Sequence, residues 1–262
     1  MAAAVVLRDK PTELARAYGN RSTDISAQAL VRIIGGLRAG VDIGRFAPDI
    51  FPGTDDSTPQ LGDIFTDVDA PGLNAQPTYV YRSVFVDLDT RNRRGNPSRG
   101  AHWLVSFGAW NDLSLEQFDY QRFDLEGAHF IPLAPTRHVL ALHGILAFVN
   151  NRIDDRVPFY AFPSVGGSDT VRGFQEFRFR DENILVLNAE YRFDVLKFLE
   201  LAAFVDAGEA RHHWGEIGFG GLRTSYGGGL RVKSEKTVFA RLDVATGGGE
   251  GTHVYMKFGK SF

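Results

Sequence analysis

Apolar and polar side chains alternate along most of the sequence. In residues 185–193, for example, an extended chain places Leu187 and Tyr191 on one face and Glu190 on the other. A period of two is typical of β-strands with two different faces, and helical periodicity is scarce. The alternating segments are residues 29–44, 79–89, 101–111, 117–131, 137–149, 185–193, 199–206, 222–232, 238–244 and 254–262, with residues 4–8 as a weaker candidate. The pattern therefore predicts an all-β protein.

The connections between these segments differ strongly in length. Long gaps occur at residues 47–78 and 150–182, whereas residues 132–136 and 194–197 leave room only for short turns. Short turns at one rim and long loops at the other are typical of antiparallel transmembrane β-barrels. At about 20–25 residues for a strand with its connection, the chain has room for ten to twelve strands.

Periodicity alone does not say which face of the strands is inside. A soluble barrel or sandwich buries its apolar face, whereas a membrane barrel turns that face to lipid. Three features favour lipid: a polar face rich in Gly, Arg, Asp and Glu, a chain that ends on Phe262, and aromatic residues near segment ends. Interfacial aromatic girdles form at such ends, and the residues concerned are Tyr79, Tyr81, Trp103, Trp110, Tyr191 and Phe193.

Composition narrows the function classes. The 262 residues carry a net charge of −3 and no cysteine, which argues against a nucleic-acid partner and excludes disulfides, thiolate metal sites and cysteine nucleophiles. No stretch approaches the ~20 apolar residues of a membrane-spanning helix, and the first residues lack the features of a signal peptide. We expect a barrel over residues 29–262, preceded by a poorly defined segment, residues 1–28, that could be a strand remnant.

One loop carries a specific motif. Val171-Arg172-Gly173-Phe174 follows the pair Gly166-Gly167, and five alternating segments come after it. This arrangement resembles the bacterial surface antigen family, the BamA/TamA type of outer-membrane assembly barrel. Further matches are Phe179-Arg180-Asp181, Ala189-Glu190-Tyr191-Arg192-Phe193, Phe204-Val205-Asp206-Ala207-Gly208, and the pair Asp89-Thr90-Arg91 with Asn96-Pro97-Ser98-Arg99-Gly100. The resemblance covers residues 79–262.

The resemblance implies that this loop folds back into the barrel lumen, where Arg172 would meet Glu190 and Asp206. Gly166, Gly167, Phe204 and Gly208 would support it. The alternation pattern is compatible with this placement, because both carboxylates lie on the polar face of their strands. A guanidinium stays charged and can hold a carboxylate through two parallel hydrogen bonds. The alternative is a solvated loop arginine. Gly173 would give the loop an unusual backbone conformation or a close approach to the wall.

The C-terminal segment resembles the signal by which barrel proteins are recognised for insertion. Its apolar positions are Val254, Met256, Phe258 and Phe262, while Lys260 departs from the usual pattern.

Other candidate chemistry is weak. His212-His213 has no further ligands nearby in the sequence, and the acidic residues Asp55, Asp56, Asp63, Asp67 and Asp69 lack the spacing of a calcium loop. Residues 246–252 are glycine-rich but lead into no helix, and no nucleophile-elbow motif occurs. The arginines of residues 91–99 form a basic turn, either solvated or in contact with lipid headgroups or a partner. We therefore expect no enzyme, no cofactor and no metal site.

The resemblance implies a role in the insertion of outer-membrane proteins or in polypeptide translocation, at the bacterial outer membrane. Partners would be membrane lipid and lipopolysaccharide, with nascent outer-membrane proteins or accessory assembly proteins, and no nucleic acid. Two alternatives stay open: a passive pore or secretion channel of the same fold, and a soluble all-β binding protein. Members of the family usually have sixteen strands and substrate-receiving domains, so we expect this chain to be a truncated or reduced barrel.

Overall fold

A computed structural model describes residues 2–3, 18–52, 61–134, 138–151 and 156–259. Most of them belong to one twelve-stranded sheet in which every neighbouring pair is antiparallel. Its strands are β1 (Ala2–Ala3), β2 (Tyr18–Ile34), β3 (Leu37–Pro52), β4 (Tyr79–Asp89), β5 (Gly100–Asp112), β6 (Tyr120–Ala134), β7 (His138–Asn151), β10 (Asn183–Leu196), β11 (Leu199–Arg211), β12 (Arg223–Lys233), β13 (Val238–Gly247) and β14 (Thr252–Phe258).

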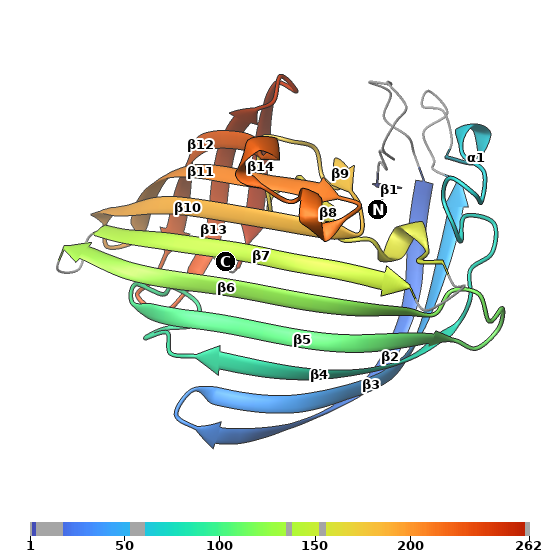
Figure 1. Cartoon of the computed structure of the whole chain (residues 1–262). Coiled ribbons are helices and arrows are strands. Elements are labelled where there is room, and N and C mark those ends of the chain that lie inside the picture. Colours follow the sequence, from blue (N-terminus) through green and yellow to red (C-terminus); the bar gives the residue numbers. More distant parts are fainter. Residues whose placement is uncertain (1, 4–17, 53–60, 135–137, 152–155, 260–262) are drawn as a thin grey trace.

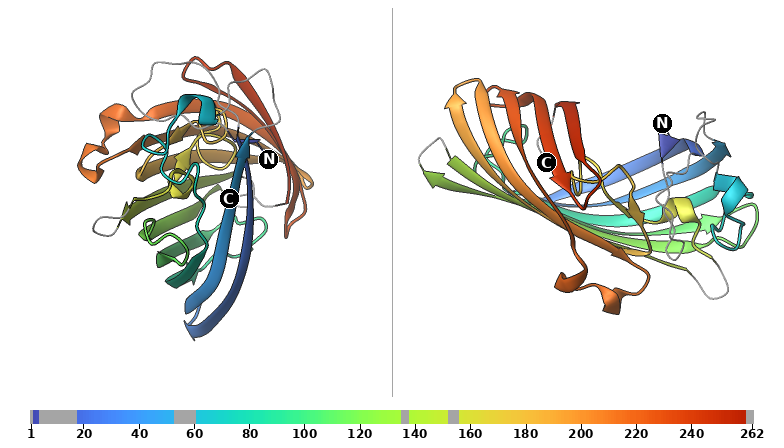
Figure 2. Two further views of the ribbon diagram at one scale, coloured as in Figure 1. Left: turned by 90° about the vertical axis from the view of Figure 1, so that its right-hand side faces the viewer. Right: turned by 90° about the horizontal axis from the view of Figure 1, so that it is seen from above.

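The strands follow one another in chain order around the sheet, so the topology is a simple up-and-down meander. The sheet curves around a concave interior, which we call the lumen (Figures 1 and 2). Among the described residues β14 pairs only with β13, so the two edges of the sheet are not joined. This is the predicted antiparallel barrel architecture, with eleven long strands and the two-residue β1.

The remaining elements are small and lie in the connections. They are α1 (Leu61–Ile64), the 3₁₀ turns η1 (Phe159–Ala161), η2 (Trp214–Glu216) and η3 (Phe219–Gly221), and the two-stranded pair β8 (Ser164–Val165) and β9 (Phe179–Arg180). The long connections that follow β3 and β7 lie at one end of the barrel, the long-loop end, and tight turns lie at the opposite, short-turn end (Figure 1). None of the described helices is long and apolar enough to span a membrane.

Apolar strand residues face outward and polar ones face the lumen. On β10, Leu187 and Tyr191 are 38% and 40% exposed, whereas Glu190 and Arg192 are buried. Such an arrangement is unfavourable in water and favourable in lipid, because the exposed apolar surface then meets acyl chains. The inside-out pattern decides between the two architectures that periodicity left open, in favour of the membrane barrel.

The segment of residues 29–44 is two strands rather than the single stripe that its pattern indicated. β2 and β3 form a hairpin whose turn is Gly35-Gly36, with Gly35 at φ 52°. Across a two-residue turn, odd-numbered residues normally lie opposite even-numbered ones, as Ile34 and Leu37 do here. An irregularity between Arg32 and Ile34 shifts the register by one residue, so that odd-numbered residues lie opposite each other beyond it, as in Ala29 opposite Val41. The alternation therefore runs through the turn without a break and conceals it.

The N-terminal boundary also differs from the prediction. β2 begins at Tyr18, ahead of the expected start of the barrel at residue 29, so the later part of the segment of residues 1–28 is strand. The candidate strand at residues 4–8 lies outside the described residues.

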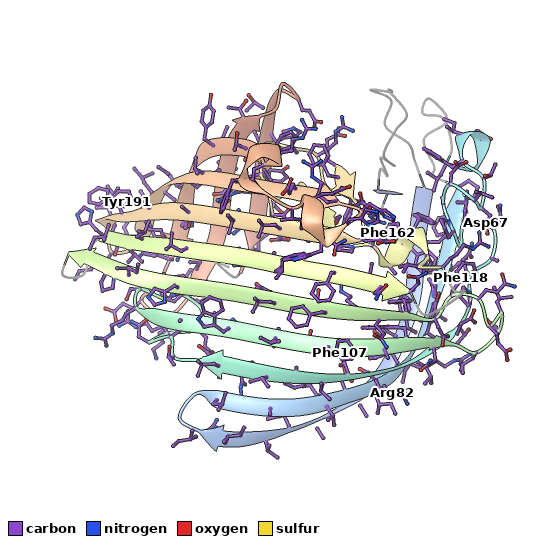
Figure 3. The ribbon with its side chains drawn as sticks, in the orientation of Figure 1. Asp67, Arg82, Phe107, Phe118, Phe162 and Tyr191 are labelled. Atoms are coloured by element: carbon purple, nitrogen blue, oxygen red, sulfur yellow. The ribbon has the colours of Figure 1, made fainter. Side chains whose placement is uncertain are left out.

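Only some of the aromatic residues predicted to form an interfacial girdle lie on the outer surface. Trp103 and Tyr191 are exposed on the outer surface, and Tyr191 lies near the short-turn end (Figure 3). Tyr79 and Tyr81 are buried on the lumen side, where Trp110 stacks on Tyr81 with ring centroids 5.5 Å apart. Closeness to a strand end does not determine the face, because that depends on whether the position is odd or even within the strand.

The inward aromatics form part of a core beneath the long loops. Tyr79 packs with Phe118, Tyr120 and Val149, and Phe162 packs against this cluster. Phe118 and Phe162 mark the long-loop end of the molecule (Figure 3). The loops therefore fold over and into the lumen at that end.

Candidate functional site

The segment between β8 and β9 forms a closed excursion into the lumen, which we call the arginine loop (residues 166–178). The pairing of Val165 with Phe179 fixes its base. Gly166 and Gly167 begin it with φ of 118° and 94°, a backbone region that glycine adopts without strain. The Gly167 N–H donates to the carbonyl of Phe174 at 3.0 Å, and the Thr170 hydroxyl accepts a hydrogen bond from the Gly166 N–H at 2.8 Å. Hydrogen bonds within the loop thus hold its shape, in addition to its contacts with the barrel wall.

Arg172 lies at the centre of the loop's contacts with the wall. Its Nε and one terminal nitrogen bind the two oxygens of Asp206 at 2.9 and 2.8 Å, and its backbone N–H donates to the same carboxylate at 3.1 Å. Its other terminal nitrogen donates to Glu190 at 2.9 Å. The guanidinium also lies over the ring of Phe204, 3.3 Å from its centroid. The structure therefore brings Arg172, Glu190, Asp206 and Phe204 together, and Arg172 is 1% exposed rather than a solvated loop residue.

Further charged residues complete the cluster and were not predicted as partners. Asp243 on β13 lies 3.4 Å from Arg172, and Arg231 on β12 donates to Glu190 at 2.7 Å. Arg192 donates to the other oxygen of Glu190, also at 2.7 Å. Arg172, Arg192 and Arg231 thus face Glu190, Asp206 and Asp243 in a buried space. Arg241 and Glu200 extend this network, since they lie 3.6 Å from Asp243 and 3.9 Å from Arg231. The three new partners Asp243, Arg231 and Arg192 lie on the polar face of their strands. Arg192 is two residues from Glu190 on the same strand, whereas only the register between strands shows that Asp243 and Arg231 join them.

The electrostatics keep Arg172 charged. Burial alone lowers the pKa of its guanidinium, but the hydrogen bonds and negative charges of Asp206 and Glu190 outweigh that effect and raise the pKa above its ordinary value. A charged group removed from water is stable only when it is paired and hydrogen-bonded. The fork of bonds to Asp206 meets this requirement and also fixes the orientation of the guanidinium.

The other motif residues shape the contact between loop and wall. A Cβ atom on Gly173 would lie 2.7 Å from the carbonyl carbon of Thr246 and 2.8 Å from the nitrogen of Gly247, so the loop backbone lies directly against β13. A Cβ atom on Gly208 would lie 3.0 Å from methyl carbons of Val165 and Val171. Small residues on both sides therefore allow the close approach.

Apolar side chains seat the loop beside the charged cluster. Val171 and Phe174 are buried and pack with residues of the base and of two strands, namely Ala147, Val165, Ile184 and Val186. Phe174 also meets Phe179 edge to face, with centroids 5.2 Å apart. The four residues of the Val-Arg-Gly-Phe motif thus divide into two apolar anchors, one charged anchor and one point of close approach.

The arginine loop also binds the last two strands directly. Arg241 on β13 donates to the carbonyl of Ser168 at 3.0 Å. On β14, the Tyr255 hydroxyl donates to the carbonyl of Phe174 at 2.9 Å, and Lys257 Nζ lies 2.6 Å from each oxygen of Asp169. Together with Glu190 on β10 and Asp206 on β11, these contacts tie the loop to four of the last five strands.

The remaining strand, β12, supports the same carboxylates, since its Ser225 donates to Asp206 at 3.3 Å and Arg231 binds Glu190. A hydrogen-bonded chain extends the network in the other direction. Asn188 donates to Asp206 at 2.9 Å, and its side-chain oxygen contacts His143 on β7 at 2.9 Å. His143 in turn contacts Glu126 on β6 at 3.1 Å. The arginine loop is therefore connected, directly or through a short chain of hydrogen-bonded side chains, to every long strand from β6 to β14.

Comparison with known proteins identifies the family of the region that contains the arginine loop and its sheet. The profile of the Omp85 superfamily domain matches residues 83–262, which include the arginine loop and the strands that bind it. The chain belongs to the Omp85 superfamily. This Omp85 barrel is thus an outer-membrane β-barrel of that superfamily, in agreement with the sequence motifs. Among proteins of curated function, none matches the sequence significantly.

Two solved structures resemble the fold of this Omp85 barrel. BamA from Haemophilus ducreyi lacking POTRA domains 1-3 superposes with a TM-score of 0.70 at 16% identity, over 94% of this chain and 55% of that one. CdiB from Acinetobacter baumannii gives a TM-score of 0.57 at 15% identity, over 93% of this chain and 42% of that one. The chain therefore spans about half the length of the proteins it resembles.

The other predicted site residues lie apart from the arginine loop. Val254, Met256 and Phe258 project outward from β14 and are 62%, 66% and 79% exposed, while Phe262 lies outside the described residues. His212 lies 3.6 Å from Asp181 and 3.5 Å from Glu182 in the loops. In the described part of the chain, no group of three or more His, Cys, Asp or Glu side chains is placed to hold a metal ion.

The basic turn and the acidic loop have structural partners. Arg91 and Arg94 both bind Asp89, so these two arginines of the turn are not free for headgroups. In the acidic loop, Asp69 accepts hydrogen bonds from Thr66, while Asp55 and Asp56 lie outside the described residues.

Proposed function

We propose that this Omp85 barrel serves the insertion of outer-membrane proteins or the movement of polypeptides across the outer membrane, with the arginine loop as its brace. Membership of the superfamily supports a role of this kind. The observation that carries the proposal is the buried binding of Arg172 to Glu190 and Asp206, together with the contacts of the same loop to β13 and β14. No catalytic chemistry is part of the proposal.

The physical basis is a free strand edge whose position is fixed. The outer edge of β14 has no partner strand among the described residues. Unpaired backbone groups cost several kcal/mol each in lipid, so such an edge is a template for the addition of another strand. Tyr255 and Lys257 hold β14 to the arginine loop from the lumen side. The brace would thus present the edge in one geometry to an incoming strand.

The partners follow from the same surfaces. The outward apolar side chains would contact membrane lipid and, in the outer leaflet, lipopolysaccharide. The strand edge would contact a nascent outer-membrane protein, and accessory assembly proteins could deliver that substrate. A passive pore is less well supported, because the arginine loop occupies the lumen.

The test is assisted folding into lipid vesicles. Vesicles containing the barrel receive a urea-unfolded outer-membrane protein, and heat-modifiable gel mobility reports the fraction that folds. We expect faster folding than in empty vesicles, and a loss of this acceleration for Arg172→Ala. The matched control is Arg178→Ala, which removes an arginine of the same loop that binds Glu250 outside the buried cluster.

The alternatives give different results in the same system. Equal folding rates with and without the barrel, combined with steady conductance in planar bilayers, would show a passive channel. Recovery of the chain as a detergent-free monomer would identify a soluble binding protein and overturn the membrane assignment.

A further inference from the structure

The connection between β4 and β5 (residues 90–99) is folded into a defined shape. Asp89 accepts hydrogen bonds from Arg91 at 2.9 and 3.0 Å and pairs with Arg94 at 2.9 Å. The side-chain oxygen of Asn92 accepts hydrogen bonds from the N–H groups of Ser98 and Arg99 at 3.1 and 3.2 Å. Because its ends and its tip are bonded in this way, the connection can act as one rigid unit.

This connection reaches the one between β12 and β13 (residues 234–237). The N–H of Val238 donates to the carbonyl of Gly95 at 3.1 Å, and the side chain of Asn96 donates to the carbonyl of Ser234 at 3.1 Å. Gly95 and Thr237 form an isolated parallel β-bridge. In the sheet, the strands β6, β7, β10 and β11 separate β5 from β12. The contact therefore runs across the concave side of the sheet at its short-turn end, and not between neighbouring strands (Figure 2).

Gly95 makes the contact possible. A Cβ atom at this position would lie 2.7 Å from the carbonyl oxygen of Lys236 and 3.0 Å from the Cβ of Thr237. No larger side chain fits without moving one connection away from the other. Arg93 and Glu235 add an ion pair at 3.6 Å on the exposed side of the contact.

The connection bridges the lumen and is not packed into a core. A cavity of about 490 Å³ lies beside it, and its lining comes from both connections and from the β10–β11 turn, including Asn96, Pro97, Lys197, Glu200, Lys233 and Ser234. A few hydrogen bonds and one exposed ion pair hold the two connections together, so they can separate without disturbing the sheet.

We propose that residues 90–99 form a strap that closes the short-turn end of the lumen, and that the strap must leave the β12–β13 connection before a solute or polypeptide can pass that end. This inference does not depend on the proposed function, since it concerns only the passage through the barrel.

The first test displaces the strap. Gly95→Leu should give several-fold larger or more frequent conductance steps in planar bilayers than the unmodified chain. The matched control is Gly220→Leu, because a Cβ atom at Gly220 meets nothing within 4 Å and the change is otherwise the same. If correctly folded Gly95→Leu barrels conduct like the control, the strap does not close the lumen and the proposal is wrong.

The second test holds the strap in place and covers the case in which Gly95→Leu does not fold. The chain has no cysteine, so Arg93→Cys combined with Glu235→Cys can be joined selectively by a short bis-methanethiosulfonate reagent. Each thiolate displaces a methanesulfinate and forms a disulfide with the reagent, and a reductant later cleaves both links. We expect brief openings in the reduced double variant, their loss after joining, and their return after cleavage. Identical traces in all three states would overturn the proposal.

Discussion

Replacing Arg172 by alanine should make the barrel unfold at a clearly lower urea concentration. The substitution removes the fork of hydrogen bonds to Asp206 and the bond to Glu190. The two carboxylates are not affected equally. Glu190 keeps Arg192 and Arg231 as partners. Asp206 keeps only neutral donors, namely the side chains of Asn188 and Ser225 and the backbone N–H of position 172.

The magnitude follows from the charge that is left behind. Removal of one partner of a fully buried ion pair costs about 3–5 kcal/mol, because the other charge stays buried without compensation. With a urea slope of about 2 kcal/mol per M, a loss of about 4 kcal/mol lowers the unfolding midpoint by about 2 M. Arg172→Lys should cost less, since an ammonium keeps the charge but cannot form the fork.

The assay is urea unfolding of the barrel in lipid vesicles, followed by tryptophan fluorescence. The double variant Arg172→Ala/Asp206→Asn separates charge from packing, because it removes the uncompensated carboxylate as well as the arginine. We expect it to be more stable than Arg172→Ala alone. A midpoint for Arg172→Ala equal to that of Arg178→Ala would refute the reasoning, since both remove one arginine of the same loop.

Three further outcomes are expected. Gly173→Val should cost about 1–3 kcal/mol by overpacking the loop against β13, and limited trypsin digestion should then cleave the loop faster than in the Gly62→Val control, whose position has open space. Lys257→Met should change stability by less than about 1 kcal/mol, because Asp169 is mostly exposed, but it should increase hydrogen exchange of β14; unchanged exchange would contradict the brace. Val84→Arg, in the middle of the outward face of β4, should cost about 2–4 kcal/mol in lipid, and no loss in vesicle folding yield would argue against lipid contact there.

The sequence predicted the β architecture and the centre of the site because both depend on local pattern. Alternation places Glu190 and Asp206 on the polar face of their strands, and the motif resemblance supplies Arg172 as their partner. Asp243 and Arg231 lie on polar faces as well, but their meeting depends on the pairing register of β12 and β13. Register is set by turns and bulges that a single sequence does not reveal.

Three other features escaped prediction for related reasons. The hairpin of β2 and β3 was hidden because the irregularity beside its turn preserves the odd-even pattern. The inward Tyr79 and Tyr81 were assigned to the outer girdle because aromatic residues are common on both faces near strand ends. The contact of the strap with the β12–β13 connection could not be predicted either, because residues 90–99 and 234–237 become neighbours only when the sheet curves.

The contacts of the arginine loop have a consequence for how the barrel reaches its final pairing. β10, β11, β13 and β14 each present at least one lumen-facing side chain to the loop. A slip of one residue in any of these hairpins would turn that side chain toward lipid and leave its partner in the loop unbound. The loop can therefore dock fully only when all of these registers are correct, so its docking is expected to come late in folding and to discriminate against misaligned barrels.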